Sequence, residues 1–287
     1  MKLFLTAFAF HLVFFAGAQI SALQKLEVDM AAAQLALGEA ENDEARFAAS
    51  DQFRTLMIEA LNSTGCFDYP FDSIQTISKM HAPDRAFRLF NWNVPRDDRT
   101  HKYYCFVLTS DPETGIYDWT ELSDNERFVE NIESKVLTPE QWMGCLYYDI
   151  IPIKEGRKTE NYILLGWDGN NRNSSKKIID VLSFNRKGVR LGAPIFKSEM
   201  GTAKRVILEY SSDVQVSVKW HAKEQRIVFD HLAPRDPMMT GVRSYYGPDM
   251  TFDAYVLKKG KLEFRSNVDI RLGKDHGGNK PYALPPK

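Results

Sequence analysis

The strongest constraint on the fold is a pair of apolar runs between Tyr162 and Phe184, which read YILLGWDGNNRNSSKKIIDVLSF. Both runs are rich in the β-branched and aromatic residues that strands favour, and a polar segment containing Gly169 and Asn170 separates them. Glycine and asparagine accept the positive φ that tight turns require. The pattern predicts an antiparallel hairpin whose arms lie in the core of a sheet and whose crest is an exposed turn.

Similar short runs occur before and after this hairpin, separated by turn residues. We expect strands at residues 85–94, 102–109, 115–122, 146–153, 190–196, 205–210, 215–220, 226–232 and 251–257. Together with the hairpin arms these make about a dozen strands, with almost no long helical pattern between them. Parallel strands need long crossover connections, so a doubly wound or βαβ arrangement is excluded. The sequence predicts a mainly β protein, an antiparallel meander that forms a two-sheet sandwich or barrel, or else a small propeller-like array.

The chain before this β region has a helical pattern. Leu26, Met30, Ala33 and Leu37 recur at spacings of four, three and four, which is one face of a helix. A second apolar stripe runs over residues 44–61, and residues 62–65 end it with C-cap chemistry. We therefore predict a helical segment at 19–65, an antiparallel β domain at 66–272 and a flexible, glycine- and proline-rich tail at 273–287.

Residues 1–18 have the three parts of a signal peptide. Lys2 provides a positive start, residues 3–15 form an apolar run, and Ala16-Gly17-Ala18 offers small residues for cleavage. We expect cleavage before Gln19, with a cut after Ala22 as the second choice. The run is shorter than the ~20 residues that a membrane span needs. The expectation is a periplasmic or secreted protein without a stable membrane span, and an uncleaved N-terminal anchor is the alternative.

Composition narrows the range of partners. Loss of Lys2 from the 37 basic residues leaves 36 against 38 acidic ones, a net charge near −2. This balance offers no basic surface for nucleic acid. The remaining chain contains Cys66, Cys105 and Cys145, an odd and widely spaced set that is neither a disulfide framework nor a metal motif. A single disulfide and three buried thiols both stay open.

The crest of the hairpin contains several oxygen-bearing side chains, as calcium loops do. Asp168 and Asn170 lie in it, and Asp180 on the second arm is a further candidate ligand. Calcium takes six to eight oxygens and its loops supply several carboxylates, whereas Asp168 is the only carboxylate in the crest and Arg172 adds a positive charge. A solvated turn is favoured, so no metal or other cofactor is expected, with calcium as the alternative.

Asp230 and His231 form a second candidate, because a histidine beside a carboxylate can act as a base. Neighbours in a regular strand point to opposite faces, so Asp230 cannot orient His231 there. No serine has a nucleophile-elbow context. A structural role for His231 is favoured over catalysis, and a hydrolase using Asp230, His231 and Asp249 is the alternative.

Aromatic residues form a third candidate. Exposed aromatic rings can stack on sugars or pack against a partner, although most rings in strands belong to the core. Trp92 with Asn91 and Asn93, and Trp167 with Asp168, lie where strands are expected to run into loops. These five residues are the predicted ligand-binding surface.

A resemblance covers roughly residues 66–271, and the following segments carry it. They are Tyr69-Pro70-Phe71-Asp72-Ser73, Phe87-Arg88-Leu89-Phe90-Asn91-Trp92-Asn93, Leu146-Tyr147-Tyr148, Leu164-Leu165-Gly166-Trp167-Asp168-Gly169-Asn170-Asn171, Lys177-Ile178-Ile179-Asp180-Val181-Leu182, Phe229-Asp230-His231-Leu232 and Tyr246-Gly247-Pro248-Asp249. In combination the chain resembles a group of exported proteins of Bacteroidota to which no activity is assigned. The resemblance implies a periplasmic or secreted setting in a bacterium and supplies no catalytic residues.

These observations favour an exported binding or assembly protein of the cell envelope over an enzyme. Its expected partner is an envelope protein or a glycan. A hydrolase with Asp230, His231 and Asp249 at strand ends and a calcium-stabilised structural domain are the alternatives.

Overall fold

The computed structural model describes residues 4–110, 117–125, 129–155 and 158–270; the side chains of residues 4–21, 155 and 158 and the predicted tail at 273–287 lie outside this description. Two N-terminal helices precede a series of mostly antiparallel strands, which confirms the predicted fold class. The chain divides into two compact units, Met1–Val129 with Thr138–Ile150, and Glu130–Leu137 with Ile151–Lys287. The expected boundary between residues 65 and 66 therefore falls inside the first unit.

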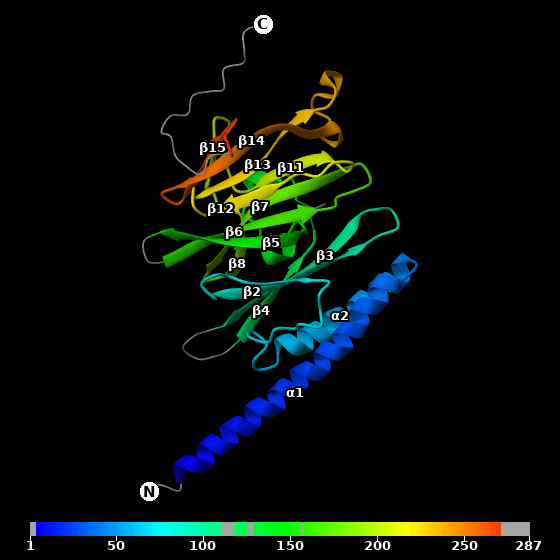
Figure 1. The fold of residues 1–287 in the computed structure, drawn as a ribbon, viewed down its shortest axis with the longest axis vertical. Helices are drawn as coiled ribbons and strands as arrows, with labels where there is room; N and C mark the ends of the chain where they lie inside the picture. Colours follow the sequence, from blue (N-terminus) through cyan, green and yellow to red (C-terminus); the bar gives the residue numbers. More distant parts are fainter. Residues whose placement is uncertain (1–3, 111–116, 126–128, 156–157, 271–287) are drawn as a thin grey trace. The chain divides into compact units, whose positions relative to one another are not determined.

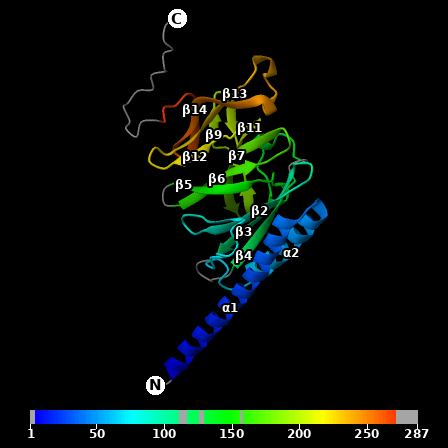
Figure 2. The same cartoon turned by 45° about the vertical axis from the view of Figure 1, so that its right-hand side comes forward.

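The two helices form an antiparallel hairpin, which both ribbon views show (Figure 1, Figure 2). Helix α1 is Phe4–Glu39 and helix α2 is Asp43–Leu61. Of the predicted helix face, Leu26, Met30 and Ala33 are buried and Leu37 is half-buried, which confirms the periodicity for its first three positions. Helix α2 begins after Asn42, whose side-chain oxygen accepts a hydrogen bond from the backbone N–H of Ala45 at 2.9 Å, as an N-cap does.

The helices cover one face of a four-stranded antiparallel sheet in the first unit. Its strands, in spatial order, are β1 Ser78–His81, β2 Phe87–Pro95, β3 His101–Ser110 and β4 Tyr117–Ser123. On this face the Trp92 ring stacks on Tyr104 at 5.0 Å and meets the edge of Phe53 of α2 at 4.9 Å. Alternation along β2 therefore places Trp92 in the core of the unit.

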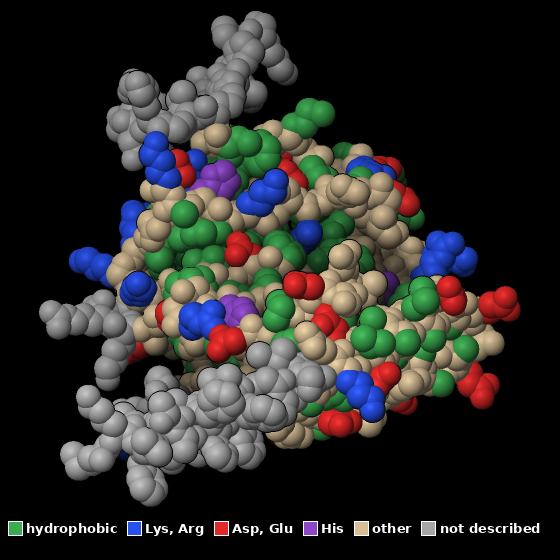
Figure 3. Space-filling view, turned by 60° about the horizontal axis from the view of Figure 1, so that its bottom comes forward, with side chains coloured by type: hydrophobic (Ala, Val, Ile, Leu, Met, Phe, Trp, Pro, Cys, Tyr) green, Lys and Arg blue, Asp and Glu red, His purple; other side chains and the backbone are tan. Residues whose placement is uncertain are grey.

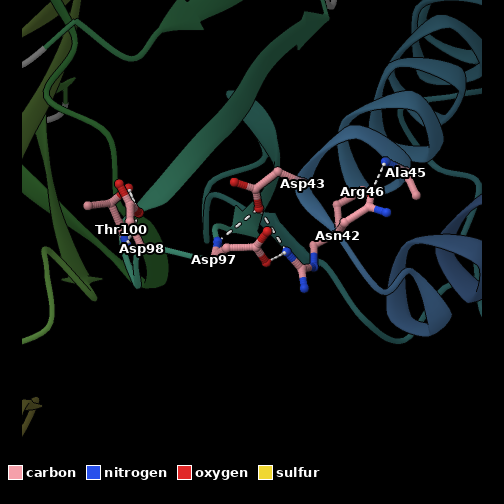
Figure 4. Close-up of polar contacts among 7 residues, drawn as sticks. All are labelled: Asn42, Asp43, Ala45, Arg46, Asp97, Asp98 and Thr100. Carbon is pink, nitrogen blue, oxygen red and sulfur yellow. Dashed lines mark hydrogen bonds and ion pairs between the residues drawn. The ribbon is translucent and has the colours of Figure 1, made fainter.

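A polar contact fastens the start of α2 to the turn between β2 and β3 (Figure 4). Arg46 Nη1 lies 2.8 Å from Asp43 Oδ1 and 2.6 Å from Asp97 Oδ1. The backbone N–H of Asp97 donates to Asp43 Oδ1 at 2.9 Å. The hydrogen bond with Asp97 raises the pKa of Arg46. Each carboxylate here is thus used to set the position of a helix end.

The second unit is a sandwich of two sheets (Figure 1). One sheet has the order β11-β7-β6-β5, with β8 beside β7. Its strands are β5 Leu146–Glu155, of which the residues up to Ile150 belong to the first unit, β6 Lys158–Asp168, β7 Ser174–Asn185, β8 Gly188–Leu191 and β11 Val206–Ser211. The other has the order β10-β9-β15-β14-β13-β12. Its strands are β9 Phe196–Ser198, β10 Gly201–Ala203, β12 Val218–His221, β13 Arg226–Pro234, β14 Tyr246–Lys258 and β15 Lys261–Arg265.

The core of this sandwich consists of aliphatic residues from one sheet and aliphatic and aromatic residues from the other. The Tyr255 ring meets Phe196 at 5.4 Å and Phe229 at 5.8 Å. Leu165 and Ile179 face them from the predicted hairpin arms, which are β6 and β7 and are buried as expected. Of the predicted alternatives, the two-sheet sandwich is the one found. The pairing of β15 with β9 is parallel, an exception in this otherwise antiparallel arrangement.

A buried ion pair holds residues 130–137 to the second unit. Arg205 Nε lies 3.1 Å from Asp180 Oδ1, and both side chains are completely buried. The other guanidinium nitrogens donate to the carbonyls of Ile132, Lys135 and Leu191. The Leu191 carbonyl also accepts from the backbone N–H of Leu137 in an isolated β-bridge, so Arg205 adds a second bond there and fastens the carbonyls of Ile132 and Lys135 as well.

Cys66, Cys105 and Cys145 are buried thiols that form no disulfide, which answers the question that the sequence left open. Within the described residues, no helix is both long and apolar enough to cross a membrane.

Candidate functional site

The hairpin of β13 and β14 carries the histidine–carboxylate pair with the most accessible imidazole. His231 Nδ1 lies 2.8 Å from Asp253 Oδ2, and the His231 side chain is 43% exposed while the Asp253 side chain is buried. A deprotonated carboxylate only accepts hydrogen bonds, so we assign the His231 ring the tautomer in which Nδ1 carries the proton and donates to Asp253. In the neutral ring Nε2 is then an acceptor. The Nε2 atom has no hydrogen-bond partner among the described residues, so it is open to a ligand or substrate.

An irregularity in the strand pairing sets the position of His231. The flanking pairs are Asp230 with Phe252 and Leu232 with Pro248. His231 alone therefore stands opposite three residues of β14, of which the middle one, Met250, has a φ of 72°. A bulge of this kind redirects side chains and is common beside functional sites. In this protein the bulge places His231 opposite the exposed Met250 in the pairing of β13 with β14.

Asp249 belongs to the same bulge. Its Oδ1 accepts hydrogen bonds from the backbone N–H and the hydroxyl of Thr251, at 2.9 and 2.7 Å. Desolvation by itself would raise the pKa of Asp249, but these two bonds and the charge of His231 outweigh it and lower that pKa. Asp249 is therefore an anion within electrostatic reach of the imidazole.

The structure brings together part of the predicted catalytic set. His231 and Asp249 are neighbours, whereas Asp230 Oδ2 accepts from the backbone N–H of Ser217 at 2.7 Å and does not contact the imidazole. The carboxylate that holds His231 is Asp253, whose Oδ1 also accepts from the N–H of Asn267 at 3.0 Å. The sequence analysis missed Asp253 because 22 residues separate it from His231 and only the strand pairing joins them.

The β13–β14 hairpin exposes apolar side chains on its closing loop and at the bulge of β14. On the loop Met238 is 89% exposed and Val242 and Tyr245 are also exposed, and at the bulge Met250 is 91% exposed. The loop contains two short 3-10 turns, η4 Pro237–Met239 and η5 Arg243–Tyr245. We call Met238, Val242, Tyr245 and Met250 the hairpin apolar group.

Hydrogen bonds fix the backbone of this loop. Asp236 Oδ1 accepts from the N–H of Met238 at 2.9 Å, and the Gly241 N–H donates to the Tyr246 hydroxyl at 3.0 Å. The Arg243 guanidinium lies 4.7 Å from the centre of the Tyr246 ring. The apolar side chains are thus presented by a loop whose conformation is already set, which lowers the entropy lost on binding.

The crest of the β6–β7 hairpin is less exposed than predicted, because Asp168 is buried. Asp168 Oδ1 accepts from the N–H of Asn170 at 2.7 Å, and Lys176 Nζ lies 3.6 Å from its Oδ2. Asn170 has the expected positive φ, 49°. Trp167 is half-buried and makes a side-chain hydrogen bond with Tyr210. Asp168 is therefore an internal partner of this turn rather than part of an exposed ligand-binding surface.

The alternative calcium ligands are not brought together. Asp180 stands opposite Leu164 while Asp168 stands opposite Lys176, four positions along the strand, which corresponds to ~13 Å at the rise of a β-strand. Asp180 is paired with Arg205 and Asp168 with Lys176. In the part of the chain that is described, no three His, Cys, Asp or Glu side chains gather as metal ligands would.

The other predicted binding residues lie in the core of the first unit. Trp92 is 1% exposed and its indole N–H donates to Ser50 Oγ at 3.2 Å, so the prediction of an exposed stacking ring is wrong. Strand β2 continues beyond it to Pro95, and the ring faces the helices rather than solvent.

Both asparagines beside Trp92 have structural partners. Asn91 is buried; its amide donates to the carbonyls of Tyr104 and Cys145 at 2.8 and 3.0 Å, and its oxygen accepts from the Tyr147 N–H at 2.6 Å. Asn93 is half-buried, with its amide 2.8 Å from His101 Nδ1. Asn91 therefore joins β2 to the start of β5 from a buried position.

No model of a protein family, no curated protein and no solved structure matches this chain. The function must therefore be inferred from the residues themselves.

Proposed function

We propose that this chain is an exported binding component of the cell envelope, and that it holds a protein partner on the β13–β14 hairpin. The observation that carries the proposal is the hairpin apolar group, in which Met238, on a loop whose backbone is hydrogen-bonded, and Met250, at the bulge of β14, are almost fully exposed. Methionine side chains are flexible and polarisable, and they adapt to the surface of a protein partner. Contact with such a partner would remove this apolar surface from water.

A protein partner is favoured over a glycan. Sugar recognition was expected from Trp92 and Trp167, but the first ring is buried and the second is half-buried and hydrogen-bonded to Tyr210. The exposed apolar residues of the hairpin are two methionines, a valine and a tyrosine. That composition suits packing against a protein surface better than stacking on a series of sugar rings.

Export is supported by the N-terminal sequence and is compatible with the packing of α1. The first buried side chain of the described part of α1 is Leu23, which follows both expected cleavage positions. Removal of the predicted signal peptide would leave that contact in place. A fusion of residues 1–22 to a reporter enzyme that is active only after export tests this step, and an inactive reporter would oppose it.

Photo-crosslinking in the producing cells tests the binding site. A photoreactive residue replaces Met238 or Met250 in separate variants, and a third variant carries it at Met200, which is 99% exposed in the turn between β9 and β10. We expect one shared protein adduct from the two hairpin positions and not from Met200. The proposal fails if the hairpin gives no adduct, or if all three positions give the same one.

A second function, acid–base catalysis, is favoured by the geometry of His231. The buried Asp253 carboxylate orients the ring through Nδ1, while Nε2 has no partner among the described residues and is placed to take a proton from water or a hydroxyl group. Ester, glycoside and peptide libraries test it with the wild type, with His231→Ala and with His221→Ala, a half-buried histidine elsewhere in the same sheet, as the control. Turnover that is lost only in His231→Ala would establish the enzyme, and no turnover by the wild type would leave the binding role.

A further inference from the structure

The contacts of helix α1 determine which of its sides faces outward. Leu23, Leu26 and Met30 are buried against α2 and the following loop. Glu27 fixes the rotation of the helix, because its two oxygens accept from the Tyr69 hydroxyl at 2.5 Å and the Ser73 N–H at 2.6 Å. The opposite side of α1 therefore faces away from the core of the first unit.

That opposite side is apolar. Val28 and Leu35, seven residues apart, are 66% and 62% exposed, and Ala32 and Ala36 on the same side are exposed as well. Seven residues are two helical turns, so these side chains form one stripe along the axis. We call Val28, Ala32, Leu35 and Ala36 the α1 outer stripe. Figure 3, which turns the lower side of Figure 1 forward, shows hydrophobic side chains exposed among acidic ones on that side.

The charges at the two ends of the stripe are complementary to each other. Lys25 lies before it and Glu39 after it; both are exposed, and neither has an ion-pair partner among the described residues. An antiparallel copy of the helix, centred between Ala31 and Ala32, places Val28 opposite Leu35 of the second copy. The same two-fold axis brings Lys25 within one residue of the second copy's Glu39, so both the apolar and the charged positions match.

From this self-complementarity we infer that the α1 outer stripe pairs antiparallel with α1 of a second copy of the chain, giving a two-fold symmetric dimer. Isologous contacts of this kind are the commonest basis of homodimers. A parallel pair would instead set Lys25 against Lys25 and Glu39 against Glu39. Lys25 is the one basic residue of segment 24–39, and the other charged neighbours of the stripe include Asp29 and Glu39, so the stripe lacks the several flanking lysines and arginines of a helix that lies on a membrane.

The dimer is expected to be weak. The paired segment, residues 24–39, is about 24 Å long at the rise of an α-helix. A contact of this length lies at the small end of specific interfaces. The dimer should therefore form reversibly and depend on concentration, and a covalent trap is the sharpest way to detect it.

Ala32→Cys provides that trap in the full chain, because residue 32 lies next to the proposed two-fold axis. The three native cysteines are buried, so the new thiol is the exposed one. Diamide would oxidise two such thiols to one intermolecular disulfide and would itself be reduced to the hydrazine. Gln52→Cys, at an exposed position on α2, is the matched control. We expect a disulfide dimer from Ala32→Cys and at least fivefold less from Gln52→Cys; equal yields, or none from either, overturn the inference.

Charge reversal tests the antiparallel register by sedimentation at low ionic strength over a concentration series. Lys25→Glu and Glu39→Lys should each raise the dimer Kd about tenfold, since each reversal affects two symmetric pairs. The double variant exchanges the charges and should return the Kd to within about threefold of the wild type. A double variant as weak as the singles, or a wild type that stays monomeric at every concentration, overturns the inference. All these positions are exposed, and circular dichroism checks that each variant keeps its helices.

Discussion

Replacing Asp180 with Asn should lower the stability of the second unit strongly. The substitution keeps the shape of the side chain and removes the negative charge beside a fully buried guanidinium. Removing one partner of a buried ion pair costs about 3–5 kcal/mol. The lower end applies here, because Arg205 keeps its bonds to three carbonyls and the amide oxygen can still accept from Nε. We expect a loss of about 3 kcal/mol, which at a urea m-value of about 2 kcal/mol/M moves the midpoint by about 1.5 M.

Arg205→Met should cost more than Asp180→Asn, since it leaves the buried Asp180 carboxylate without its cation and removes one donor from the carbonyls of Lys135 and Leu191. Urea unfolding followed by tryptophan fluorescence and circular dichroism measures both. Asp68→Asn, which breaks the exposed pair with Arg85, is the control and should change stability by about 0.5 kcal/mol or less. An Asp180→Asn midpoint equal to that of the control would refute a desolvated ion pair.

The same residue allows a test of the calcium alternative. Because Asp180 is paired with Arg205, a chelator should leave the melting temperature of the purified chain unchanged. A lower melting temperature that added calcium restores would mean that the carboxylates of this region bind a cation.

Three further predictions concern buried polar groups. Asn91→Leu should lower the free energy of unfolding by about 2–4 kcal/mol in a urea titration, because it leaves buried backbone groups unpaired; a loss below about 1 kcal/mol would contradict this. Desolvation lowers the pKa of His81 despite its hydrogen bond to a backbone carbonyl, so the folded chain binds fewer protons than the unfolded chain. Stability should therefore fall as the pH drops below the ordinary histidine pKa of about 6.5, and His81→Gln should reduce that fall in unfolding curves at pH 5 and 8. Burial raises the pKa of Cys66 to about 12, and all three buried thiols should resist an aromatic disulfide reagent until urea is added; rapid labelling of the folded chain would oppose this.

The sequence predicted well those elements whose periodicity is long and regular. The helix expected at 44–61 is α2, Asp43–Leu61, and the strand expected at 102–109 is β3, His101–Ser110. Strands β1, β9, β10 and β15 were not predicted as separate strands, and the strand expected at 190–196 is divided, since β8 ends at Leu191 and β9 begins at Phe196. Strands β1, β9 and β10 have three or four residues, and β15, KLEFR, has only two apolar side chains.

The candidate site was only partly predictable, because a break in strand register creates it. The alternation rule correctly separated Asp230 from His231, which have different partners. The alternation rule does not predict which side chain of β14 contacts His231, because that contact depends on the bulge at Met250. Asp253 becomes the partner of His231 because β13 and β14 pair across a long loop. The local sequence does not show which residues of the two strands stand opposite each other, so it does not predict this contact.

Most polar residues chosen from the sequence satisfy buried groups of the chain itself. Asn91 pairs with backbone groups of two segments, and Asp180 holds the arginine that binds residues 130–137. A sheet protein with irregular connections buries backbone groups that no ladder pairs, and short polar side chains are the means to satisfy them. His231 differs, because one ring nitrogen is held by a buried carboxylate while the other is open on a half-exposed ring. An oriented but unsatisfied group is what a binding or catalytic role requires, and on this criterion the β13–β14 hairpin ranks above both the crest of the β6–β7 hairpin and Trp92.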